Sequence, residues 1–117
     1  MKNVESWKTA VEMGLDPRAY TYAPDKVPTE EIEAVLDCKI WAKQTMGIGC
    51  YFTEIGTGCK FVLTVYRSNK DGEYKVRNCP IDFTDCPIGE KYALKVALNG
   101  HGNPYIQAAA QISGDKL

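Results

Sequence analysis

The sequence is poor in the groups that most enzymes use for catalysis. It has one histidine, His101, among 117 residues, so any catalytic or metal-binding imidazole would have to be that one. Its 14 basic and 15 acidic residues nearly balance, so no global positive field draws the protein toward nucleic acid or an anionic membrane. No apolar run approaches the roughly 20 residues needed to span a bilayer. These absences argue against a histidine-dependent enzyme and against a membrane protein.

A secretory signal is also missing from the sequence pattern. The first apolar residues are interrupted by Glu5, Lys8 and Glu12, whereas a signal peptide has an unbroken apolar stretch. Five cysteines in such a chain are typical of free thiols in a reducing compartment. We therefore expect a cytoplasmic protein whose cysteines are unpaired.

The cysteines lack the spacing of a zinc knuckle, in which two to four residues separate a pair of ligands. The closest pair, Cys79 and Cys86, has six intervening residues and lies in NCPIDFTDCPIG. Each precedes a proline, which favours extended backbone, so we interpret both as corners between a strand and a loop. We expect no metal and no cofactor. The alternatives are a metal-thiolate site joining these two with Cys50, Cys59 and His101, or a cysteine nucleophile paired with His101.

Two N-terminal segments have helical patterns. Val4, Trp7 and Val11 lie at helical spacing in NVESWKTAVEMG, which predicts a short helix. A second helix is expected over about residues 29–45, where Thr29 can cap the first turn and glutamates favour the positive end of the helix dipole. Its apolar stripe consists of Ile32, Val35, Leu36 and Ile40.

After Gly47 the composition changes to β-branched and aromatic residues, which are enriched in strands. The segments IGCYFTEI and CKFVLTVYR are separated by the turn GTG, and an Asp-Gly turn in SNKDGE leads into YKVRNC. These patterns predict a three-stranded antiparallel meander. Apolar residues then alternate from Tyr92 to Leu98, before the turn NGHGN, and predict a fourth strand.

The segment 104–113 fits two structures. Its alternating apolar residues, which favour a strand, are Ile106, Ala108, Ala110 and Ile112. Asn103 followed by Pro104, together with three alanines, instead favours the start of a helix. We favour the strand, because the strand at 92–98 needs a neighbour and the turn supplies one.

Together these elements predict a single α+β domain, with a helical front over 1–46 and a five-stranded antiparallel sheet over 47–113. The run GEKYALKVALNGHGNPYIQAAAQI resembles the last hairpin of OB-fold barrels, in which a G-x-x-Y-x-L/V strand leads through a glycine-rich turn to G-x-P-Y-I. The resemblance implies that the sheet closes into a small OB-like barrel without exposed edges. The chain between Cys79 and Ile88 is too short for the helix that commonly joins strands three and four of that fold.

The β region interleaves aromatic and basic residues, a pairing that holds single-stranded nucleic acid by stacking bases and neutralising phosphates. The candidate nucleic-acid-binding residues are Lys60, Tyr66, Arg67, Lys75 and Arg77. The competing interpretation is that the aromatic residues fill the core and the lysines solvate the outer face of the sheet.

Charge is divided unevenly along the chain. Residues 1–37 carry four basic and eight acidic side chains, a net charge of −4, whereas residues 38–117 carry ten and seven, a net charge of +3. The acidic front suggests an alternative function as a protein-interaction or inhibitor module, such as a phage or plasmid accessory protein. We therefore expect a small non-enzymatic binding protein whose partner is single-stranded nucleic acid or another protein.

Overall fold

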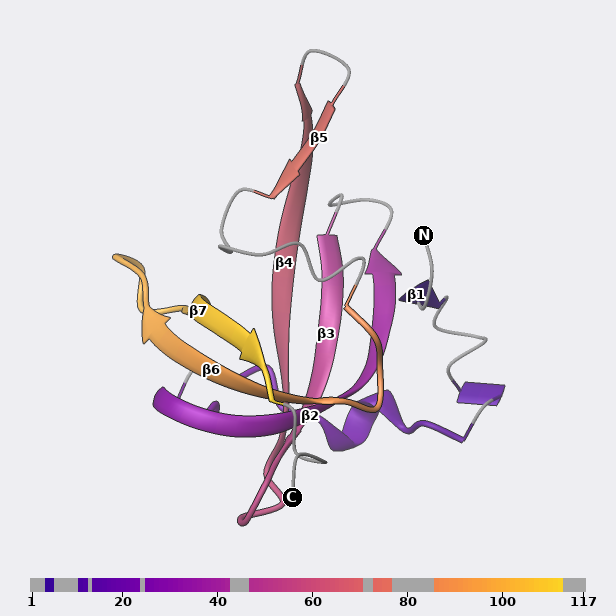
Figure 1. The fold of residues 1–117 in the computed structure, drawn as a ribbon, viewed down its shortest axis with the longest axis vertical. Coiled ribbons are helices and arrows are strands. Elements are labelled where there is room, and N and C mark those ends of the chain that lie inside the picture. The colour runs from indigo at the N-terminus through magenta and orange to yellow at the C-terminus, as the bar shows by residue number, and fades with distance from the viewer. Residues whose placement is uncertain are drawn as a thin grey trace.

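The computed structural model describes residues 4–5, 11–12, 14–23, 25–42, 47–70, 73–76 and 86–112. Within these ranges the chain is a small β-rich domain built on one sheet (Figure 1). The strands are β1 (Val4–Glu5), β2 (Glu30–Ala42), β3 (Gly47–Glu54), β4 (Lys60–Lys70), β5 (Glu73–Val76), β6 (Lys91–Leu98) and β7 (Pro104–Gln111). Their order across the sheet is β5-β4-β3-β2-β6-β7, and β1 pairs with β2 in parallel.

The α+β prediction, with its helical front over 1–46, is wrong. No helix of seven or more residues occurs in the described ranges, and the stretch predicted as the second helix is β2, the longest strand. The first predicted helix falls largely outside the described residues. Ile32 and Leu36 fit a helical stripe, but with Ala34 they also alternate, and all three are buried. Strands on both sides of β2 supply its hydrogen bonds, and this tertiary context overrides local helix propensity.

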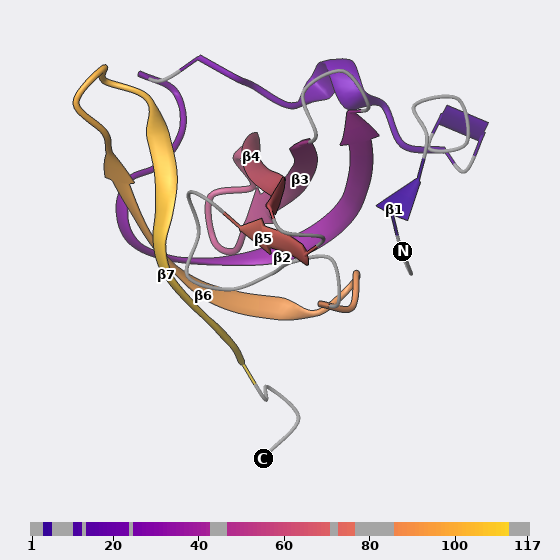
Figure 2. The same cartoon turned by 90° about the horizontal axis from the view of Figure 1, so that it is seen from above.

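The antiparallel strands beyond residue 47 are confirmed. β3 pairs with β4, and β4 with β5, as the predicted meander. β6 pairs with β7, so segment 104–113 takes the strand structure and not the helix. The long strand β2 joins the two halves, because residues 30–35 pair with β6 and residues 34–42 pair with β3. Seen from above, β2 curves around β3 and β4 (Figure 2).

The predicted closure into an OB-like barrel is wrong, because the sheet is not closed. β7 approaches β4, but the hydrogen-bonded strand order ends at β7 on one side and at β5 on the other. Closure requires a continuous ladder around the barrel. The sheet therefore keeps an edge at β7.

A β-bulge in β2 changes which of its side chains face the main core and which face the other side of the sheet. Leu36 pairs with Phe52 and Cys38 with Tyr51, so Asp37 is an extra residue without a register partner in β3. An extra residue shifts the alternation of side chains by one position. Leu36 belongs to the main core, whereas Cys38 belongs to a smaller cluster on the opposite face. The main core comprises Val27, Ile32, Ala34, Leu36, Ile48, Cys50, Phe52, Phe61, Leu63, Val65, Tyr92, Leu94, Val96 and Ile106.

The smaller cluster is covered by the chain that precedes β2. Its buried members are Tyr20, Cys38, Ile40, Tyr51 and Val62. After the 3-10 turn η1 (Pro17–Ala19), Thr21 forms a parallel bridge with Phe61. The Thr21 amide donates to the Lys60 carbonyl at 3.0 Å, and the Thr21 carbonyl accepts from the Val62 amide at 3.0 Å. This pairing holds the N-terminal segment against the start of β4.

Candidate functional site

Among the described residues, polar and aromatic side chains gather on the face of the sheet covered by the N-terminal segment. Alternation in β3 buries Phe52 in the main core and turns Tyr51 and Thr53 to this second face. Alternation after Leu36 puts Asp37 on the same face, the bulge adds Cys38 there, and β4 begins on that face with Lys60. With the two tyrosines that flank Thr21, these residues form what we call the outer-face cluster: Tyr20, Tyr22, Asp37, Tyr51, Thr53 and Lys60.

Asp37 is the centre of this cluster. Its Oδ2 accepts a hydrogen bond from the Tyr20 hydroxyl at 2.8 Å and another from the Thr53 hydroxyl at 2.5 Å. Its Oδ1 accepts none from the residues that the structure describes. The side chain is half-buried. Asp37 is thus a carboxylate held in a fixed orientation by one oxygen, with the other available to a ligand.

The tyrosines form a connected group. The Tyr20 and Tyr51 rings meet edge to face with their centroids 5.1 Å apart, a favourable aromatic geometry. The Tyr22 and Tyr51 hydroxyls are 2.8 Å apart. Burial raises the pKa of Tyr20 above its usual value, reinforced by its hydrogen bond to Asp37, and burial likewise raises the pKa of Tyr51. Both phenols therefore stay protonated at neutral pH and remain donors.

Lys60 lies beside this group and forms no ion pair with any residue that the structure describes. Its ammonium donates to the Thr53 hydroxyl at 3.0 Å and lies 5.2 Å from the centroid of the Tyr20 ring. Among the described residues no carboxylate lies within 4.0 Å of it. The Thr53 hydroxyl thus accepts a hydrogen bond from the Lys60 ammonium and donates one to Asp37. It links the cation to the carboxylate without a direct ion pair.

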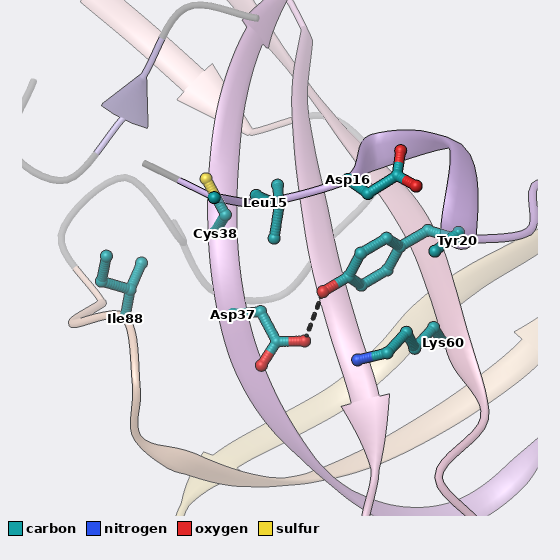
Figure 3. A pocket seen from close by; sticks show the side chains of 9 residues that line it. Leu15, Asp16, Tyr20, Asp37, Cys38, Lys60 and Ile88 are labelled. Atoms are coloured by element: carbon teal, nitrogen blue, oxygen red, sulfur yellow. Dashed lines mark hydrogen bonds between the residues drawn. The ribbon is translucent and has the colours of Figure 1, made fainter. Parts of the chain in front are cut away.

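A cavity of about 530 Å³ opens beside Asp37 (Figure 3). Its lining residues are Gly14, Leu15, Asp16, Ala19, Tyr20, Asp37, Cys38, Lys60 and Ile88. In the view of Figure 3, Asp37 lies between Ile88 on one side and Lys60 on the other. The cavity combines apolar walls with a fixed acceptor and a nearby cation, which is the usual composition of a small-ligand site.

Of the residues predicted to bind nucleic acid, the structure places Lys60 in the cluster. Tyr66, Arg67 and Lys75 lie in β4 and β5, where Tyr66 pairs with Gly47 and Lys75 with Ser68; their side chains are outside the described part of the chain, as is all of Arg77. Arg67 follows Lys60 by seven positions, or roughly 23 Å along an extended strand. These four residues stay predictions; of those whose backbone is described, Tyr66 and Arg67 lie in the second half of β4 and Lys75 lies in β5.

Tyr20, Tyr22 and Asp37 were missed by reasoning from the sequence. The prolines in and around AYTYAP are typical of a loop, although its two tyrosines alternate around Thr21 as in a short extended strand. Asp37 was placed inside a predicted helix. No local pattern marks it as a bulge, because its position depends on the pairing with β3.

The cysteines do not converge within the described ranges. Cys38 and Cys50 are buried, Cys59 and Cys86 are partly buried, and no disulfide joins these four described cysteines. Among the described residues no three histidine, cysteine, aspartate or glutamate side chains lie together as a metal site would require. Cys79 and most of NCPIDFTDCPIG lie outside the described ranges, so the four-cysteine alternative is not tested there. His101 lies in an exposed turn, with its amide bonded to Asn99 Oδ1 at 2.8 Å.

Comparisons of the chain with protein-family models, with curated proteins and with solved structures gave no match. In the part of the chain that the structure describes, no helix combines the length and apolar composition needed to cross a membrane. The function is therefore inferred from the outer-face cluster and its cavity.

Replacing Tyr20 with phenylalanine should lower the free energy of unfolding by about 1.5 kcal/mol, because Asp37 would lose one of its two hydroxyl donors. Urea denaturation followed by circular dichroism measures this change. The matched control is Tyr22→Phe, which removes a part-buried hydrogen bond between two neutral hydroxyls and should cost about 0.5 kcal/mol. Equal effects of the two substitutions would show that the bond to Asp37 does not hold the N-terminal segment.

Proposed function

We propose that the protein is a small non-enzymatic module that binds single-stranded nucleic acid on the outer face of β3 and β4. The observation that carries the proposal is the position of the Lys60 ammonium, 5.2 Å from the Tyr20 ring centroid and without an ion-pair partner among the described residues. Such a cation is available to a phosphate, and the exposed ring of Tyr22 is available to a base. The four described cysteines form no disulfide with one another, which supports a cytoplasmic location as part of the proposal.

Tyr22 supplies the stacking surface in this proposal. Its side chain is 57% exposed, while its hydroxyl is held by Tyr51 at 2.8 Å. A ring that is already held in place loses little conformational entropy when a base stacks on it. Base stacking on an exposed aromatic side chain contributes about 1–3 kcal/mol.

Fluorescence anisotropy with a labelled mixed-sequence oligonucleotide, over a series of salt concentrations, tests the proposal. Affinity should fall as salt rises, because phosphate contacts release counterions. Lys60→Gln should reduce the slope of log affinity against log salt by about 0.7. Tyr22→Ala should weaken binding about 5- to 150-fold, as 1–3 kcal/mol implies, with the slope unchanged.

Lys95→Gln is the matched control for Lys60→Gln. Lys95 is an exposed lysine of β6, where it pairs with Ala108 of β7. Both strands lie apart from the proposed interface on β3 and β4. Its substitution changes the net charge equally and should leave affinity and slope unchanged. Binding that is insensitive to salt, or an equal effect of the two lysine substitutions, would contradict the proposed interface.

We propose self-association as the second candidate function, favoured by the edge strand β7. Residues 107–111 read QAAAQ in both directions and carry no charge. The Ile112 amide donates to the Lys91 carbonyl at 2.8 Å, so by antiparallel alternation the backbone groups of Ala109 and Gln111 point away from β6. An uncharged edge strand lacks the charged side chains that usually prevent such strands from pairing with another chain. A second copy of this chain is the partner that matches such a palindromic edge.

Size-exclusion chromatography with light scattering at increasing protein concentration tests this second candidate. The wild type should form a dimer, whereas the double substitution Gln107→Lys with Gln111→Lys should remain monomeric through repulsion between like charges. Mixing that variant with the corresponding double glutamate variant should restore a one-to-one dimer. A wild type that stays monomeric at every concentration would remove this function and leave the nucleic-acid proposal untouched.

A further inference from the structure

We propose that the cavity beside Asp37 receives a nucleobase that carries an amino group, and that it favours cytosine over thymine or uracil. This inference rests on the proposed function, because it assigns a base to the interface that Lys60 and Tyr22 form. It rests on three features of the described residues: a fixed acceptor, apolar walls of suitable size, and a cation near the opening.

The acceptor is Asp37 Oδ1. Because the Tyr20 and Thr53 hydroxyls both donate to Oδ2, the carboxylate is held in one orientation and Oδ1 keeps its full capacity, about two hydrogen bonds. A hydrogen bond to an ionised carboxylate is stronger than one between neutral groups, so a donor on the ligand would bind Asp37 Oδ1 favourably. The complementary ligand group is therefore an N–H donor, as on an exocyclic amine.

The walls suit a flat heterocycle. Leu15, Cys38 and Ile88 contribute apolar side chains, and the volume of about 530 Å³ lies within the range of small-ligand pockets. In Figure 3 Ile88 and Cys38 lie on the side of Asp37 away from Lys60, and Leu15 lies above Asp37. A base between the apolar side chains would place its edge against Asp37.

The chemistry of the base edge then decides the preference. Cytosine presents an amino donor at position 4, whereas thymine and uracil present a carbonyl acceptor at the same position. A carboxylate accepts from the first group and repels the second. Lys60 is the cavity-lining cation and is available to the phosphate of the same nucleotide. Cytosine and thymine are similar in size, so a comparison between them isolates the contact with Asp37.

The test compares labelled oligo-dC and oligo-dT of equal length at one low salt concentration, by fluorescence anisotropy. The wild type should bind oligo-dC at least about tenfold more tightly, since a single base-edge contact contributes about 1–3 kcal/mol and 1.4 kcal/mol is tenfold. Asp37→Asn should reduce the preference to less than about twofold, because an amide offers a donor as well as an acceptor. The dependence of binding on salt should be retained in that variant.

Two further variants keep the test decisive if Asp37→Asn folds poorly. Asp16→Asn changes a carboxylate on the rim of the same cavity that is 66% exposed and 3.8 Å from Arg18 Nε, and it should keep the preference for oligo-dC. Ile88→Trp fills the cavity without altering Asp37, and it should remove the preference while salt-dependent binding remains.

The outcomes separate the inference from the proposed function. If neither oligonucleotide shows salt-dependent binding, both are overturned. If both bind equally in the wild type, or if the preference survives Asp37→Asn and Ile88→Trp, the cavity inference alone is overturned. Asp37-dependent binding of an arginine-rich peptide, with no binding of either oligonucleotide, would assign the cavity to a protein partner and overturn the inference.

Discussion

Replacing Lys39 with glutamate should lower the free energy of unfolding by about 3–5 kcal/mol, because the substitution leaves a buried charge without compensation. Among the described residues, Lys39 is the charged side chain that is fully buried, with 0% of its surface exposed. Its ammonium donates to the Cys86 carbonyl at 2.5 Å. A carboxylate at this position would face that carbonyl oxygen, which is an acceptor and cannot donate. Chemical denaturation followed by circular dichroism measures the loss.

Lys91→Glu is the matched control, since it makes the same change of charge at an exposed position of β6. It should alter the free energy of unfolding by no more than about 0.5 kcal/mol. If the two variants are equally stable, Lys39 is not buried in solution, and the shift in alternation that the bulge produces is absent.

Replacing Phe52 with alanine should cost about 3–5 kcal/mol, the usual loss when a buried aromatic ring leaves a cavity. Phe52 is fully buried in the main core. Its ring stacks on Phe61 with centroids 5.5 Å apart and planes at 20°, so the substitution also removes an aromatic pair. Thermal and urea unfolding of the variant measure the change.

Ile55→Ala serves as the control for Phe52→Ala. Ile55 lies at the turn after β3 and is 41% exposed, so its truncation should cost about 0.5 kcal/mol or less. A Phe52→Ala variant that loses less than about 1 kcal/mol would mean that β3 does not bury Phe52 against β4. The outer-face cluster would then lose its support, because Tyr51 and Thr53 lie on the same strand.

The strands that were predicted correctly share one property. Each shows alternating apolar residues and pairs with a strand that is close to it in the sequence. β3 and β4 are joined by a glycine-containing turn, and β6 and β7 by NGHGN. Alternation selects the buried face of each strand, and the turn fixes the neighbour. Tyr92, Leu94 and Val96 therefore lie in the core, as their alternation indicates.

The second predicted helix failed because the first half of β2 takes its partner from a distant part of the chain, while its second half pairs with the next strand. The distant partner is β6, about sixty residues later, and the next strand is β3. Local propensity carries no information on such pairings. The outer-face cluster was only partly predicted, because its residues are separated in the chain. Lys60 was identified from its place among aromatic residues. Tyr20 and Asp37 come near it only when β2, β3 and β4 are assembled.

The amino-acid sequence by itself determined the antiparallel hairpins beyond residue 47, because alternation and turn residues act between near neighbours in the chain. Tertiary structure alone decided that residues 30–42 are a strand, that Asp37 is an extra residue in it, and that the sheet remains open. The strand at 30–35 depends on pairing with the distant strand β6, and the bulge depends on the register between β2 and β3, which no local pattern shows. The proposed binding site arises where β2 and β3 meet the N-terminal segment.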